Sequence, residues 1–240
     1  ISLVKGAGAQ VWDADGNEYL DFLGGIATNI LGHAHSALIS AITKQANELG
    51  HVSNLYSHPR AIELAEKLKD LTGSTEAKVF FCNSGAEANE AALKLSRLSG
   101  RKKIISTLGS FHGRTIGALS MTGQVAKRKA FLPLLKDVAF IPYNDVKAAK
   151  KAISKKVAMV IVEPIQGENG VVVPDLGYLK TLRELTSKHG VLLVFDCVQT
   201  GMGRTGEWFG FEHAGISPDA VTMAKGMGNG MPVGALWARR

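Results

Sequence analysis

Two residues near the end of the sequence, Asp196 and Lys225, have the types and surroundings that acid–base and amine chemistry require. The apolar run Val191–Phe195 predicts a strand covered on both faces, and Asp196 follows at its carboxyl end, where open α/β sheets bind ligands. A second apolar segment, Asp219–Ala224, leads to Lys225 in a glycine-rich loop. An Asp at such a place can also simply cap a loop, so the surrounding residues must show whether Asp196 binds a ligand.

Two unrelated chemistries could use this stretch. The segment Gly201–Gly206 has the GxGxxG spacing of a dinucleotide-binding loop, but the residues after it lack a helical period, and no acid follows about 20 residues on to bind a ribose. The alternative is a Schiff base between Lys225 and the aldehyde of pyridoxal phosphate (PLP). PLP needs a phosphate cradle, an acid at its pyridine nitrogen and a flat group against its ring. The context favours PLP.

A phosphate cradle is expected where the strand Lys78–Cys82, predicted to be buried, meets the helix that runs to Leu98. Gly85 lets the backbone approach an anion closely at the positive end of that helix. The Ser84-x-x-Glu87 spacing is also a capping box, so helix capping without a ligand explains the motif equally well.

Aromatic and charged candidates follow another predicted strand, 104–108. Phe111 and His112 form an aromatic pair in a glycine-containing loop and can lay a ring over a planar cofactor. Arg114, in the same loop, can bind a carboxylate through two hydrogen bonds.

Two acids and a tyrosine complete the set of candidates. Glu163 and Glu168 come after the buried strand 157–162, at the expected ligand-binding edge of the sheet, although acids at strand ends are commonly just solvated. Tyr56, in the polar and aromatic loop 53–56, could line a site or merely belong to a connection between two helices.

Strands and helices alternate from Lys78 to the end, which predicts an α/β fold with a doubly wound, mostly parallel sheet and helices on both faces. Residues 1–70 are expected to precede this domain, 71–240, as a hairpin around Asp15 and Gly16, an extended loop over 20–31, and helices over 36–49 and 59–71.

Composition and charge limit the kinds of partner that we expect this protein to bind. The formal net charge of +7 is spread along the chain rather than gathered into basic arms, so we expect no nucleic-acid partner. No apolar run reaches membrane-span length and the first residues do not resemble a signal peptide, which predicts a cytoplasmic protein without a membrane partner. Cys82 and Cys197 suggest neither disulfides nor a metal site, and His33 and His35 lack a third ligand nearby, so no metal is expected.

Five motifs, taken together and in order, resemble the class III, ornithine-type aminotransferases, which belong to the fold type I PLP enzymes. They are Phe80–Glu90, Phe111–Thr115, Glu163–Glu168, Val198–Gly206 and Ala224–Gly226, and they extend over nearly the whole chain. The resemblance implies a fold type I large domain, PLP as cofactor, and a homodimer with its sites at the interface.

The resemblance also implies roles for single residues. Lys225 would form the Schiff base and carry the proton between substrate and cofactor, while Asp196 would keep the pyridine nitrogen protonated. The remaining roles are phosphate binding by Ser84, Gly85 and Ala86, ring contacts by Phe111, His112 and Val198, a contact of Gln199 with the ring hydroxyl, carboxylate binding by Arg114, and a gate for the amino donor at Glu168.

The activity implied by the resemblance is transfer of the terminal amino group of N-acetylornithine to 2-oxoglutarate, in arginine biosynthesis. Ile26 stands where ornithine aminotransferases usually have a tyrosine, which favours the acetylated donor over ornithine, 4-aminobutyrate or another ω-amino acid. A non-catalytic PLP-binding module is the alternative from another class.

Two departures from the family pattern stand out. Cys197 replaces the glutamate that usually follows the aspartate, and we hypothesise that this loosens the orientation of Asp196. The family continues well past the lysine, with a threonine borrowed by the partner subunit, a second substrate arginine and a small C-terminal domain. We therefore expect this chain to be a fragment.

Overall fold

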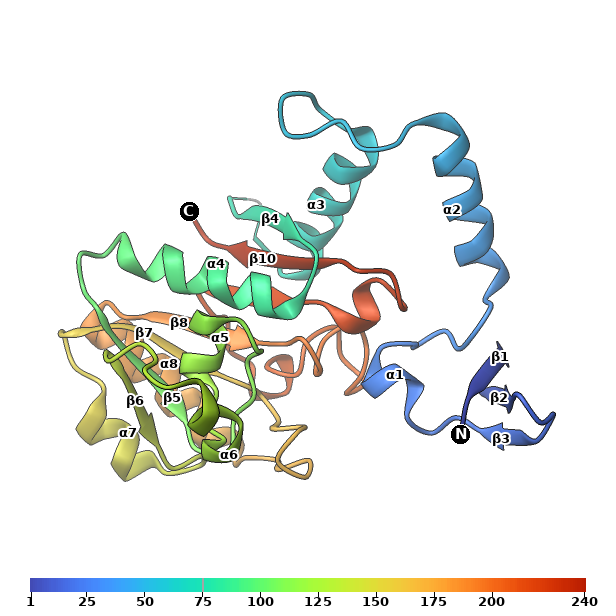
Figure 1. Cartoon of the computed structure of the whole chain (residues 1–240). Helices are drawn as coiled ribbons and strands as arrows, with labels where there is room; N and C mark the ends of the chain where they lie inside the picture. Colours follow the sequence, from blue (N-terminus) through green and yellow to red (C-terminus); the bar gives the residue numbers. More distant parts are fainter. Residues whose placement is uncertain (75) are drawn as a thin grey trace.

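The computed structural model describes residues 1–74 and 76–240, which form two separate β-sheets (Figure 1). The small sheet contains β1 (Leu3–Ala7), β2 (Gln10–Asp13) and β3 (Glu18–Leu20). The large sheet contains β4 (Lys78–Cys82), β5 (Lys103–Thr107), β6 (Val138–Ile141), β7 (Val157–Val162), β8 (Leu192–Asp196), β9 (Ala220–Met223) and β10 (Gly234–Ala238). Their order across the large sheet is β4-β10-β9-β8-β7-β5-β6.

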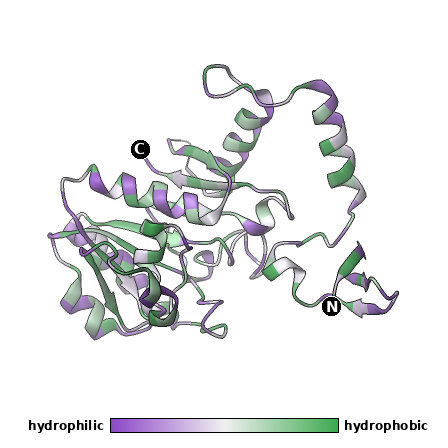
Figure 2. Cartoon of the chain, in the orientation of Figure 1, coloured by the Kyte–Doolittle hydropathy of each residue, from purple (hydrophilic) through white to green (hydrophobic). Residues whose placement is uncertain are grey.

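The large sheet is mostly parallel, as predicted. Neighbouring strands from β9 through β8, β7 and β5 to β6 all pair in parallel, and only β10 runs the other way, antiparallel to both β9 and β4. Every residue of β7 is buried, which agrees with its unbroken apolar sequence. Figure 2 shows the same concentration of hydrophobic residues in the central strands.

Helices cover both faces of the large sheet, which confirms the doubly wound arrangement. One core layer packs α3 (Pro59–Leu71), α7 (Val146–Ala152) and α8 (Leu176–His189) against the strands through residues such as Leu68, Ile153 and Leu182. The opposite layer packs α4 (Gly85–Arg97) and α5 (Ile116–Met121) through Ala92, Leu93 and Met121. The polar loops between these layers therefore meet at the edge where the parallel strands end.

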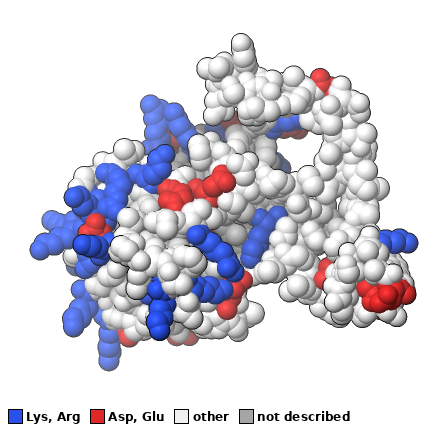
Figure 3. Space-filling view, in the orientation of Figure 1, with Lys and Arg blue, Asp and Glu red and all other residues white. Residues whose placement is uncertain are grey.

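The segment before α3 differs from this layered body. The hairpin is present, but the extended loop predicted over 20–31 is wrong in part, because α1 (Gly24–Ala27) forms there with left-handed backbone at Gly25 and Ile26. Helix α2 (Ser36–Glu48) has no buried residue and stands away from the body in Figure 1. Figure 3 shows an opening between α2 and the body, and a mainly uncharged surface along α2.

Two features of the large sheet were not anticipated. The prediction that 78–82 is a buried strand is wrong, because β4 is the outer strand and Phe80 is 53% exposed. The reversed strand β10 was not predicted at all, although its sequence GALWA is apolar and largely buried. None of the described helices is long and apolar enough to cross a membrane.

Candidate active site

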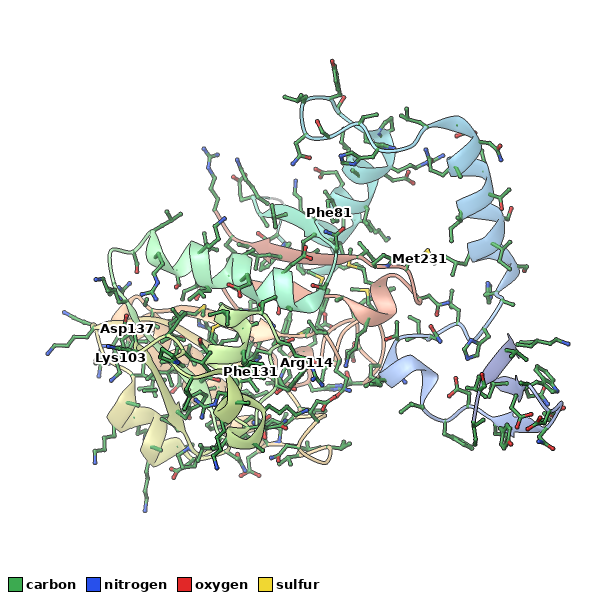
Figure 4. All side chains as sticks on the ribbon, viewed as in Figure 1. Phe81, Lys103, Arg114, Phe131, Asp137 and Met231 are labelled. Carbon is green, nitrogen blue, oxygen red and sulfur yellow. The ribbon has the colours of Figure 1, made fainter. Side chains whose placement is uncertain are left out.

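A cavity of about 500 Å³ lies beside the N-terminus of α4, at the edge where the parallel strands end. Every predicted site residue except Tyr56 lines it: Ser84, Gly85, Ala86, Phe111, His112, Arg114, Glu163, Glu168, Asp196, Val198, Gln199 and Lys225. Tyr56 is 73% exposed in the connection between α2 and α3, so its role as a site residue stays a prediction. Figure 4 labels two of the lining residues, Arg114 and Met231.

Asp196, the last residue of β8, is held in place by three hydrogen bonds and is only 4% exposed. Its Oδ2 accepts from Nδ2 of Asn89 at 2.8 Å and lies 2.7 Å from Nδ1 of His112, and its Oδ1 accepts from the Val198 N–H at 3.0 Å. Oδ2 of Asp196 thus lies within hydrogen-bonding distance of two side chains at once. We call Asn89, His112 and Asp196 the floor of the site.

The N-terminus of α4 forms another wall. Ser84 Oγ accepts from the Glu87 N–H at 3.2 Å, as the predicted capping box requires. The Glu87 side chain reaches back one residue further than the box predicts, because its Oε2 accepts from the Asn83 N–H at 3.0 Å. A side chain at Gly85 would put its first carbon 2.7 Å from Cγ2 of Val198. Only glycine therefore fits here, and the positive end of the helix opens onto the cavity.

Lys225 follows β9 and begins a short 3-10 turn with φ at +47°, a left-handed conformation that is unfavourable for a lysine. Burial lowers the pKa of its amine, and the negative charges of Asp196, Glu168 and Glu163 partly oppose that shift. A strained backbone and a partly desolvated amine are the properties expected of a reactive lysine.

Glu163 joins the loops after β7 and β5. Its Oε1 accepts from the Phe111 N–H at 2.9 Å. Burial raises the pKa of Glu163 to about 7, and the nearby charge of Asp196 adds to this while His112 opposes it. The carboxyl group therefore serves to fix the backbone of the aromatic loop beside the floor.

The entrance of the cavity carries exposed and half-exposed charges. Arg114 lines it, and Glu168 forms an ion pair with Lys127 at 3.1 Å. We call Arg114, Glu168 and Lys127 the mouth of the site. The backbone just after Arg114 is fixed from α4, because Glu90 Oε1 accepts from the N–H groups of Gly117 and Ala118 at 2.7 and 3.2 Å.

The N-terminal segment reaches the site at one place. Thr28 lines the cavity, and Asn229 Oδ1 accepts from the Leu31 N–H at 2.7 Å. A side chain on Gly226 would come 2.9 Å from Cγ2 of Ile30, so the turn after Lys225 packs closely on this segment. Ile26 is not part of the lining, and its influence on the choice of donor stays a prediction.

Sequence reasoning missed Asn89 and Lys127. Asn89 belongs to the motif Phe80–Glu90 and lies one turn into the expected helix. Its Nδ2 donates to Oδ2 of Asp196 at 2.8 Å and to the carbonyl of His112 at 2.7 Å, and no local pattern in the sequence indicates these contacts. A lysine in a basic stretch such as 127–129 is usually solvated, so the sequence offered no signal for Lys127.

The loop around Gly201–Gly206 and the side chain of Cys197 lie close to Asp196 in sequence, and the structure shows what each of them contacts. Residues 197–211 form turns with no helix among them, so Gly201–Gly206 lacks the context of a dinucleotide-binding loop. The side chain of Cys197 packs in the core layer with Phe195 and Phe209, and it makes none of the three hydrogen bonds that hold Asp196. The described part of the chain has no group of three His, Cys, Asp or Glu residues arranged around a metal position.

Comparison with known proteins shows which family this chain belongs to. The family model described as "Aminotransferase class-III" matches residues 1–240. The chain belongs to the class-III aminotransferases. This confirms the family resemblance carried by the five motifs.

Class-III relatives of known name are similar over nearly the whole chain. An acetylornithine aminotransferase of Streptomyces coelicolor is 56% identical over 98% of this chain, and one of Mycolicibacterium smegmatis is 58% identical over 99%. The chain spans 58% and 61% of the length of these two relatives.

Solved structures of an aminotransferase and a transaminase share the fold. The ornithine aminotransferase of Toxoplasma gondii, which has PLP at its active site at partial occupancy, superposes with a TM-score of 0.94 at 35% identity and matches all of this chain and 59% of its own. A PLP-bound amine transaminase from an uncultivated Pseudomonas species gives a TM-score of 0.94 at 28% identity, over all of this chain and 62% of its own.

Proposed function

We propose that the protein is a PLP-dependent aminotransferase that moves the terminal amino group of N-acetylornithine to 2-oxoglutarate. The observation that carries this proposal is the meeting of Lys225, the buried carboxylate of Asp196 and the N-terminus of α4 around one cavity. Two acetylornithine aminotransferases that share more than half of its residues support the choice of donor.

The residues of the cavity fit PLP. Asp196 Oδ1 accepts one hydrogen bond from Val198, and a carboxylate oxygen can accept a second, as a protonated pyridine nitrogen requires. The glycine at position 85 keeps the helix N-terminus open to a phosphate. When bound, PLP supplies an electron sink for the negative charge that forms on the substrate carbon.

Each residue of the chain then has a defined task. Lys225 would hold the cofactor and would carry a proton at the substrate carbon through its amine, whose pKa is lowered by burial. Asp196, oriented by its contacts with Asn89 and His112, would fix the protonation of the ring nitrogen. Ser84, Gly85 and Ala86 bind phosphate, while Gln199 reaches the ring hydroxyl.

The rings and charges around the cofactor orient it and the substrate. Phe111 and Val198 would each contact a face of the ring, and His112 would be a further ring contact. Arg114 binds the substrate carboxylate through its guanidinium group. Glu168 controls access of the amino donor.

A homodimer and a cytoplasmic location belong to the same proposal. The unburied helix α2 presents Ile39 and Ile42, which are 52% and 40% exposed, and a second copy of the chain would cover such apolar side chains. Residues 71–240 would form the PLP-binding domain, with 1–70 as the segment before it. The free cysteines Cys82 and Cys197 suit a reducing compartment.

A parallel assay of amino donors tests this function. With 2-oxoglutarate as acceptor, kcat/KM should be highest for N-acetylornithine among acetylornithine, ornithine and 4-aminobutyrate. Higher kcat/KM for free ornithine or 4-aminobutyrate would refute the assigned donor, and bound PLP without turnover of any of the three would refute the activity itself.

A further inference from the structure

Lys127, in the short helix α6 (Val125–Arg128), contacts two residues of the cavity without being part of its lining. Its Nζ lies 3.1 Å from Oε2 of Glu168 and 4.5 Å from the centre of the Phe111 ring. One ammonium group thus joins the loop after β7 to the loop after β5.

The surroundings make this contact stronger than an ordinary surface ion pair. The side chains of Lys127 and Glu168 are only 31% and 28% exposed, so water screens their attraction incompletely. The aromatic face gives the ammonium a second favourable partner. Both contacts favour one position of the Glu168 carboxylate.

The charge of Glu168 matters because the proposed acceptor, 2-oxoglutarate, carries two carboxylates. Arg114 offers one cation for a substrate carboxylate, while Glu163, Asp196 and Glu168 all contribute carboxyl groups to the same cavity. A ligand with a second carboxylate must place that group in the same cavity, where an unpaired Glu168 would repel it. An ammonium 3.1 Å from Glu168 largely cancels this repulsion.

We propose that Lys127 is a specificity-determining residue that neutralises Glu168, so that the site accepts ligands with two carboxylates. The inference rests on the proposed aminotransferase function and names one residue that lets its acceptor, a dicarboxylate, enter. Lys127 acts through Glu168, so it is a positioning residue.

Binding of two unreactive acids tests the proposal. Glutarate carries two carboxylates and butyrate one, and neither has a carbonyl group that can react. In calorimetric titrations of the whole PLP-loaded protein, Lys127→Met should raise the Kd of glutarate about tenfold and that of butyrate less than about twofold. Lys127→Arg, which keeps the charge, should bind glutarate like the parent.

Two further variants separate pairing from a general loss of charge. Adding Glu168→Gln to Lys127→Met should restore most of the glutarate affinity, because the carboxylate that repels the ligand is then gone. Lys150→Met removes the same charge from an exposed position of α7 and should leave both Kd values unchanged.

The proposal is overturned if Lys127→Met weakens glutarate and butyrate equally, or if the added Glu168→Gln gives no recovery. Should Lys127→Met fold poorly, Glu168→Gln alone decides, since it must bind glutarate at least as tightly as the parent. Because these titrations need no turnover, a protein that binds glutarate in the predicted series but transfers no amino group contradicts the proposed function and leaves this inference standing.

Discussion

The floor and the mouth of the site are built in opposite ways. On the floor, Asp196 and His112 are buried, and each hydrogen bond is fixed by a residue of the layered body. At the mouth, Arg114 is exposed and Glu168 depends on one ion pair with Lys127. We therefore expect substitutions on the floor to reduce catalysis strongly. We expect the change of a single charge at the mouth to alter which ligands bind.

The largest effect is expected from Asp196→Asn on the floor. The substitution keeps the shape of the side chain and removes the charge that fixes the protonation of the ring nitrogen, so kcat should fall about 100-fold or more. Asp175→Asn, at the exposed cap of α8, is the matched control and should change kcat little. Steady-state kinetics with saturating PLP make the measurement, and a fall under tenfold would place the essential acid elsewhere.

The second test concerns Glu163 and stability. Because burial raises the pKa of Glu163 to about 7 from 4.5, the folded protein keeps a proton that the unfolded chain loses between these values. The parent should therefore lose about 1–3 kcal/mol of unfolding free energy, relative to Glu163→Gln, as the pH rises from 4.5 to 7, with no further change above. Urea unfolding at pH 5 and pH 8 measures it, and equal differences at both pH values would contradict the raised pKa.

A smaller effect is expected at Gly85, at the N-terminus of α4. Gly85→Ala puts a methyl group against Val198, so PLP affinity should fall about tenfold. Because Val198 is also proposed to contact the cofactor, the reference is Val198→Ala alone. In fluorescence titrations with PLP, Gly85→Ala should lower the affinity less in the Val198→Ala background than in the parent. If Gly85→Ala lowers the affinity by the same factor in both backgrounds, crowding against Val198 is not the cause.

The smallest effect is expected from the mouth. Glu90→Ala releases the backbone after Arg114, which should raise KM for N-acetylornithine about three- to fivefold with little change in kcat. Glu90→Gln keeps an acceptor oxygen and should behave more like the parent. A fall in kcat at unchanged KM would show that Glu90 acts on the floor instead.

The sequence was most informative where local patterns and long-range packing agree. The continuous apolar run of β7 and the strand before Asp196 could be predicted because parallel strands buried on both faces need such runs. The edge position of β4 could not, because it depends on pairing with β10, more than 150 residues away along the chain, which period and composition do not reveal. The antiparallel direction of β10 is likewise set by its pairing with β9 and β4, and composition does not reveal it.

The same limit applies to the site. Lys225, Asp196 and Gly85 follow strands or begin helices, so their place at one edge follows from the fold. Asn89 and Lys127 act through side-chain contacts across 107 and 41 positions of the chain, and no local pattern marks them. The exposed position of Tyr56 likewise depends on how the segment before β4 sits against the body.

The measurement that tests the central claim most directly is the location of the cofactor. The protein is mixed with PLP, its visible absorption is recorded, and the adduct is reduced with borohydride and mapped by peptide analysis. The account predicts an absorption band that disappears on adding N-acetylornithine and a single reduced adduct on Lys225, which Lys225→Ala abolishes. An adduct on another lysine, or none on a folded protein, would contradict it.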